Sequence, residues 1–103
     1  MIVEKRTYTV QPGKMAEFLA IYEAEGLAIH TKYLTMLGYF VSDIGPQNQV
    51  VTLWSYESMA DREDRRARLY ADPAWRAVLA KTVPMVQAAE NVILKPTSFS
   101  PIR

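Results

Sequence analysis

The sequence predicts an α+β fold of the ferredoxin-like type, in which a four-stranded antiparallel sheet carries helices on one face. Three observations support this prediction. Strand-like and helix-like segments follow the order strand, helix, strand, strand, helix, strand, which is the βαββαβ unit. The chain has 103 residues and is 50% hydrophobic, enough to fill one core. No repeat or linker interrupts it, so we expect one domain over residues 1–103.

The N-terminal part is expected to form a strand and then a long helix. Ile2–Val10 combines β-branched and aromatic residues and is followed by the turn signal Pro12-Gly13, so it is expected to be a strand. Apolar residues then recur at the i, i+3, i+4, i+7 spacing of a helix between Met15 and Tyr33. Because Gly26 lies inside this pattern, we expect it to kink or divide the helix.

The middle of the chain is expected to form a hairpin. Met36–Ile44 and Gln49–Glu57 are rich in β-branched and aromatic residues. The residues between them, Gly45–Asn48, have the composition of a hairpin loop, so the two strands should pair antiparallel.

The second helical region carries strong terminal signals. Ser58 is followed three residues later by Asp61, a variant of the capping box that also suits the positive N-terminus of a helix. This helix is expected to run to about Asp72. Pro73 then suits the first turn of a new helix, which should end at Pro84.

The remaining strand is expected at Glu90–Lys95, followed by a tail, Pro96–Arg103, with two prolines. Apolar side chains occupy both alternating positions of the two hairpin strands, so both faces of the sheet should be apolar. Helices cover one face. We expect the other to pack against a second copy, giving a homodimeric α+β barrel.

Composition excludes several classes of function. Lys plus Arg number 12 and Asp plus Glu number 11, and a net charge of +1 is too small for a dedicated nucleic-acid or membrane-surface binder. Without cysteine and with one histidine, a structural zinc site or a Cys nucleophile is not expected. For the same reason no metal is expected. Four scattered glycines form no phosphate-binding loop, so no nucleotide cofactor is expected. Neither a membrane span nor a signal peptide is evident, and the expected location is cytoplasmic.

The charged run Glu4-Lys5-Arg6 is unusual because the first strand is central in this fold. Charges in such a place must be paired or must bind something. One interpretation is an internal ion pair or a bridge between subunits; the other is a pocket for an anionic or polar ligand. Arg6 and Tyr8 share one face of the strand, where Arg6 could hold a carboxylate or phosphate in bidentate fashion and Tyr8 could add a hydroxyl.

Five further residues each have more than one interpretation. His30, the single imidazole, lies on the apolar stripe of the first helix and is either packed there or a general base. Tyr39 and Trp54 belong either to the core and dimer contact or to the walls of a cavity. Arg62 and Arg66 form one column of a helix that faces solvent, a partner subunit or the lip of an anion site.

Several segments together resemble a known family over nearly the whole chain. They are Met1-Ile2-Val3-Glu4, Leu37-Gly38-Tyr39-Phe40, Ile44-Gly45-Pro46, Leu53-Trp54-Ser55-Tyr56 and Asp72-Pro73-Ala74-Trp75. The sequence is similar to bacterial members of the NIPSNAP family. This resemblance implies a dimeric α+β barrel related in fold to small cofactor-free monooxygenases, and it implies no agreed reaction or catalytic residues. The vesicle-transport and mitophagy roles of the longer animal proteins are not carried over.

Three functions follow as hypotheses. The first is a NIPSNAP-like homodimer that binds a small, partly apolar or anionic ligand between sheet and helices through Arg6, Tyr8 and His30. The second is a cofactor-free oxygenase or isomerase for an aromatic or enolisable substrate, with His30 or Tyr8 abstracting a proton. The third is a protein-interaction module that presents Arg62 and Arg66 to a partner.

Overall fold

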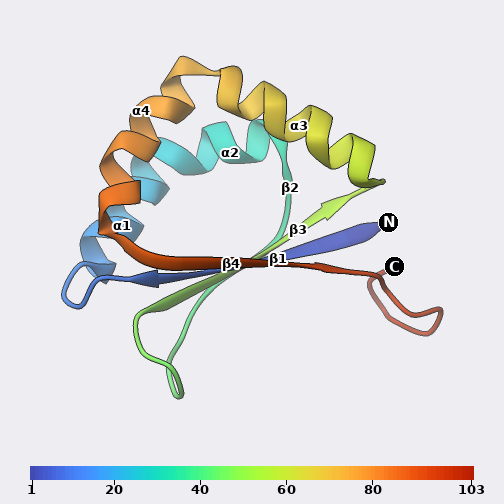
Figure 1. Ribbon diagram of the computed structural model, residues 1–103, viewed down its shortest axis with the longest axis horizontal. Helices are drawn as coiled ribbons and strands as arrows, with labels where there is room; N and C mark the ends of the chain where they lie inside the picture. The colour runs from blue at the N-terminus through green and yellow to red at the C-terminus, as the bar shows by residue number, and fades with distance from the viewer.

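The sheet has four antiparallel strands in the order β2-β3-β1-β4, and every helix lies on one side of it (Figure 1). The computed structural model describes residues 1–103. The predicted ferredoxin-like α+β fold is confirmed. The strands are β1 (Ile2–Val10), β2 (Thr35–Val41), β3 (Gln49–Tyr56) and β4 (Val86–Leu94). The helices are α1 (Met15–Ile21), the π-helical η1 (Tyr22–Gly26), α2 (Leu27–Tyr33), α3 (Met59–Ala71), α4 (Pro73–Thr82) and the 3₁₀ turn η2 (Val83–Met85).

A π-helical segment divides the first helix, where the sequence predicts a kink or division at Gly26. The wider turn of a π-helix inserts one residue into the helical pattern. A Cβ atom at Gly26 would lie 3.1 Å from Tyr22 Cδ2 and 3.2 Å from Val78 Cγ1. Glycine therefore lets this helix pack closely against α4 and leaves room for the Tyr22 ring.

Two strand boundaries differ from the prediction by more than one residue. β4 begins at Val86, four residues before the expected Glu90, because pairing with β1 extends the strand through residues that have little strand propensity of their own. β2 ends at Val41 and not at Ile44. Ser42 then joins the hairpin loop, where its hydroxyl accepts a hydrogen bond from Gln49 N at 3.1 Å.

The predicted helix starts are present in α3 and α4. Ser58 Oγ accepts from Asp61 N at 3.1 Å, as in a capping box, whereas an Asp61 carboxylate oxygen accepts at 2.9 Å from Glu57 N, one residue before the N-cap. Asp72 caps α4 by accepting from Ala74 N at 2.9 Å, with Pro73 in the first turn.

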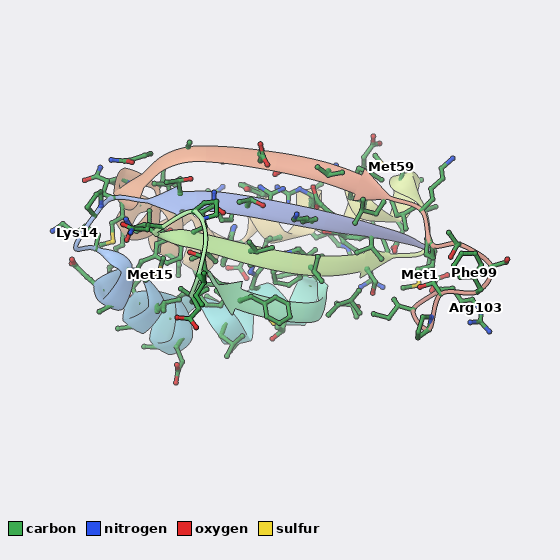
Figure 2. All side chains as sticks on the ribbon, turned by 90° about the horizontal axis from the view of Figure 1, so that it is seen from below. Met1, Lys14, Met15, Met59, Phe99 and Arg103 are labelled. Carbon is green, nitrogen blue, oxygen red and sulfur yellow. The ribbon has the colours of Figure 1, made fainter.

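The two faces of the sheet differ in what covers them. Inner residues point toward the helices and form two buried clusters, one around Trp54 and one around Val10. Figure 2, seen from below, shows the four strands side by side with the helices behind them. The strand register and the alternation of side chains define this outer face, which no other element covers. Its residues include Val3, Lys5, Phe40, Val51, Leu53, Glu90, Val92 and Leu94.

None of the helices has the length and apolar composition that a membrane span requires.

Candidate functional site

A cavity of about 350 Å³ lies between the inner face of the sheet and the helices. Residues of both core clusters line it, Tyr22 and Trp75 from one and Phe18 from the other. Eleven of its 15 lining residues are hydrophobic, so the walls are mainly apolar. The most exposed large lining side chains are Val83 at 58% and Tyr70 at 42%. We therefore place the opening between α3, η2 and the edge strand β4.

The charged end of the cavity is built on β1. Arg6 Nε donates to the Tyr8 hydroxyl oxygen at 2.7 Å, and Arg6 Nη1 donates to Glu4 Oε2 at 3.1 Å. Arg62 Nη2, from α3, donates to the same Glu4 oxygen at 2.8 Å. The Glu4 side chain is fully buried, with 0% exposure. Two guanidinium groups thus share one carboxylate, which leaves one positive charge without a partner.

The Glu4 carboxyl group stays ionised despite its burial. Burial alone would raise its pKa, but the hydrogen bond from Arg62 and the positive charges of Arg6 and Arg62 outweigh this effect and lower the pKa below its ordinary value. The side chain of Asn91, opposite Arg6 on β4, adds an amide oxygen that accepts from Arg6 Nη1 at 2.8 Å when the amide is oriented to suit its neighbours.

His30 also lines the cavity and packs against two indole rings. Its ring centroid is 4.1 Å from that of Trp54 and 4.4 Å from that of Trp75. Burial, together with the charges of Arg66 and Arg6, lowers the pKa of His30 to about 3, so the imidazole is neutral at physiological pH.

A hydrogen bond joins Tyr22 to the imidazole of His30. The Tyr22 hydroxyl is 2.8 Å from His30 Nδ1. Burial raises the pKa of Tyr22 well above its ordinary value, so this hydroxyl keeps its proton. The hydrogen bond therefore joins two neutral side chains.

Four of the seven predicted site residues line the cavity: Arg6, Tyr8, His30 and Tyr39. The other three predicted residues, Trp54, Arg62 and Arg66, are not part of its lining.

Of the two interpretations given for Trp54, the structure places it in the core and not in the wall of the cavity. It is fully buried beside His30, and its Nε1 donates to Thr52 Oγ1 at 2.8 Å. It therefore packs against His30, which lines the cavity, without lining the cavity itself.

The two α3 arginines also differ from expectation. Arg62 points inward to Glu4 and so faces neither solvent nor a ligand directly. Arg66 donates to the hydroxyl of Tyr70 at 3.3 Å and lies over its ring. It therefore contacts Tyr70 at the opening but does not line the cavity.

Sequence reasoning missed several lining residues, among them Tyr22, Tyr70 and Trp75. Tyr22 and His30 share the predicted apolar stripe of the first helix. This shared stripe is the one sequence feature that indicates their contact. The structure adds the π-helical turn between them, and no spacing rule for a regular α-helix anticipates it. No group of three or more His, Asp or Glu side chains is arranged to hold a metal ion.

The sheet order and the helix-covered cavity define this chain as a ferredoxin-like α+β protein with an internal, mainly apolar cavity. The chain belongs to the NIPSNAP family, whose sequence model matches residues 3–101. It is 45% identical to a NIPSNAP family protein from Agrobacterium tumefaciens, with a TM-score of 0.97 and coverage of 99% of this chain and 98% of that one. An uncharacterised NIPSNAP domain protein from Burkholderia xenovorans gives 44% identity and a TM-score of 0.95, with coverage of 98% and 99%.

Eukaryotic relatives match over the same region. The NipSnap homolog of Dictyostelium discoideum is 36% identical over 93% of this chain, which spans 43% of that protein. The chain spans less than half the length of the curated relatives it matches. A putative antibiotic biosynthesis monooxygenase from Caulobacter crescentus, at 20% identity and a TM-score of 0.69 over 94% of this chain and 90% of that one, shares the fold.

Proposed function

We propose that this protein is a homodimer that binds a small, partly apolar, anionic ligand in the cavity of each subunit. The observation that carries the proposal is the pairing of mainly apolar walls with one uncompensated guanidinium charge, that of Arg6. Ligand sites in proteins combine apolar lining with a few convergent polar groups in the same way. A volume of about 350 Å³ is at the lower end of the range for such sites, so the ligand is small.

Two alternatives receive less support. A histidine whose pKa is about 3 is a weak base, and efficient general bases have pKa values near the working pH, so proton abstraction by His30 is not part of the proposal. A protein-interaction role for the Arg62 and Arg66 column is weakened because Arg62 is engaged with buried Glu4.

Filling the cavity is expected to abolish ligand stabilisation. Ala89 lies opposite Tyr8 on the edge strand β4 and lines the cavity, so Ala89→Phe adds a ring inside it with little strain on the backbone. A ligand at 100 times its Kd should raise the Tm of the wild type by roughly 10 °C and leave that of Ala89→Phe unchanged. The measurement is a thermal-shift screen of small organic acids, alcohols and aromatic compounds.

The matched control is Ala67→Phe, because Ala67 is exposed on α3 and is not part of the lining. This variant should respond to ligands as the wild type does. The proposal fails if no compound stabilises the wild type more than it stabilises Ala89→Phe.

The outer face supports the homodimer. It exposes Phe40 at 54%, together with Val92 and Leu94, and apolar patches of this kind mark association surfaces. It also carries Lys5 and Glu90, neither of which has an ion-pair partner in its own chain. Two copies related by a two-fold axis would bury the apolar residues and could pair each Lys5 with Glu90 of the partner subunit.

Val92→Glu is expected to dissociate this dimer, because it places a carboxylate in the centre of the buried apolar patch. Sedimentation equilibrium should give the wild type twice the chain mass of 11.7 kDa and the variant a single chain mass. Met59→Glu, at an exposed apolar residue of α3, is the control and should remain dimeric. A wild type that sediments as a monomer at tens of micromolar would contradict the proposal.

A further inference from the structure

We propose that the ligand is a monocarboxylate, bound by a mixed pair of donors, Arg6 Nη2 and the Tyr8 hydroxyl. This inference rests on the proposed function and names the ligand group that the charged end of the cavity recognises. It replaces the bidentate guanidinium contact that the sequence predicts for Arg6.

The contacts of Arg6 leave only one of its nitrogens free. Nε donates to Tyr8 at 2.7 Å, and Nη1 donates to Glu4 at 3.1 Å. Nη2 has no hydrogen-bond partner in the chain and is not sealed off as a buried unpaired atom. A carboxylate needs Nε and Nη2 together, or both terminal nitrogens, for a bidentate guanidinium contact. Each of these two pairs of nitrogens already has one member engaged, Nε with Tyr8 and Nη1 with Glu4.

Tyr8 supplies the second donor. Its oxygen accepts from Arg6 Nε, so its own hydrogen points away from Arg6. No acceptor for this hydrogen is present in the chain, and Tyr8 lines the cavity. One carboxylate can therefore take a hydrogen bond on each oxygen, from Arg6 Nη2 and from Tyr8. Glu4 and Arg62 hold the guanidinium in place for this contact.

The charge balance among Glu4, Arg6 and Arg62 selects a monoanion. Arg66 also acts on Glu4 through its charge, but it is not part of the cavity lining and bonds to Tyr70. Arg6 and Arg62 share the single negative charge of Glu4, so one additional negative charge neutralises the cluster. The cavity lining includes no Asp or Glu that would repel this charge, and neutral His30 adds no second positive charge. A phosphate monoester, with nearly two negative charges at neutral pH, would bring a charge that has no partner in the cavity.

The apolar walls describe the rest of the ligand. Phe18, Tyr39 and Trp75 bring aromatic rings to the lining, and Val83 and Val86 bring aliphatic groups from the side of the opening. With a volume of about 350 Å³, this arrangement fits an acid with one aromatic ring or a short branched chain.

Matched probes test the carboxylate directly. We would titrate the chain of residues 1–103 with 3-phenylpropionate, its neutral amide 3-phenylpropanamide and inorganic phosphate by calorimetry. The acid is expected to bind at least tenfold more tightly than the amide, because charge-assisted hydrogen bonds are the stronger ones. Phosphate is not expected to bind.

Variants test the donor pair. Tyr8→Phe should weaken binding of the acid by roughly tenfold or more and leave the weaker binding of the amide nearly unchanged. Tyr33→Phe removes a tyrosine hydroxyl that bonds to Asp72 outside the cavity, and it should bind both probes as the wild type does. Arg6→Lys keeps the charge and loses Nη2, so it should also weaken binding of the acid. The Tm of each variant shows that it is folded.

Each outcome separates this inference from the proposed function. Equal affinity for acid and amide would be compatible with a ligand site in the cavity but would overturn the inference that this site recognises a carboxylate. Unchanged binding of the acid to folded Tyr8→Phe would overturn the mixed pair. Failure of the acid to bind, while other compounds stabilise the wild type and not Ala89→Phe, would overturn the ligand class alone. If no compound stabilises the wild type, the proposed function itself fails.

Discussion

Glu4→Ala is expected to lower the free energy of unfolding by about 3–5 kcal/mol, the largest effect of any single substitution considered for this chain. The substitution removes the carboxylate that Arg6 and Arg62 share and leaves two guanidinium groups largely buried without a counter-charge. A small domain has only about 5–15 kcal/mol of stability, so the variant should be close to unfolding at 37 °C. Urea denaturation at fixed protein concentration measures the difference.

Two comparisons make this result specific. Glu63→Ala removes an exposed glutamate of α3 that forms no ion pair, and it should change the free energy of unfolding by less than about 0.5 kcal/mol. The contribution of Glu4 should also depend on pH. Because its folded-state pKa is lowered, this contribution is complete above about pH 4.5 and is lost as the pH falls through the folded-state value. A loss of under 1 kcal/mol in Glu4→Ala would show that the carboxylate is not structural.

The stability of the wild type is expected to fall by roughly 2–3 kcal/mol between pH 6.5 and 4.5. His30 is the cause. The unfolded chain takes up a proton on this histidine below about pH 6.5, whereas the folded chain does so only near pH 3, where its pKa lies. The unfolded state therefore binds more protons in this window, and stability decreases as the pH decreases. Each pH unit contributes at most about 1.4 kcal/mol.

The chain offers a direct control, since His30 is its only histidine. His30→Phe removes the titrating group, so its stability should vary little over the same two pH units, even though Tyr22 loses its partner. NMR titration of the imidazole carbons supplies an independent measurement. A ring that titrates near pH 6.5 in the folded protein would contradict the burial on which this expectation depends.

The fold could be predicted because its signals are local. The Ser58 and Asp61 capping box, Pro73 at a helix start and the glycine turns each specify a boundary without reference to the rest of the chain. The start of β4 could not be predicted in this way. Residues such as Ala88 and Ala89 are strand residues because β1 offers them a hydrogen-bonding edge, which is a property of the assembled sheet.

The candidate site was predictable to the extent that strand alternation and helix periodicity determine it. Alternation places Arg6 and Tyr8 on one face, and periodicity places His30 on the buried stripe. Neither rule gives the distance between elements that are far apart in sequence. Arg62 therefore seemed a surface residue, although it reaches Glu4, 58 positions earlier in the chain. The homodimer and the cytoplasmic location stay predictions.

The packing of His30 between Trp54 and Trp75 gives the protein an intrinsic optical reporter. These are the only two tryptophans in the chain, and both rings contact the same imidazole. All indole emission therefore originates beside the cavity, and none comes from a distant part of the molecule. Entry of a ligand or arrival of a proton at His30 would change the whole fluorescence signal, so binding and unfolding can be followed in the unlabelled wild type.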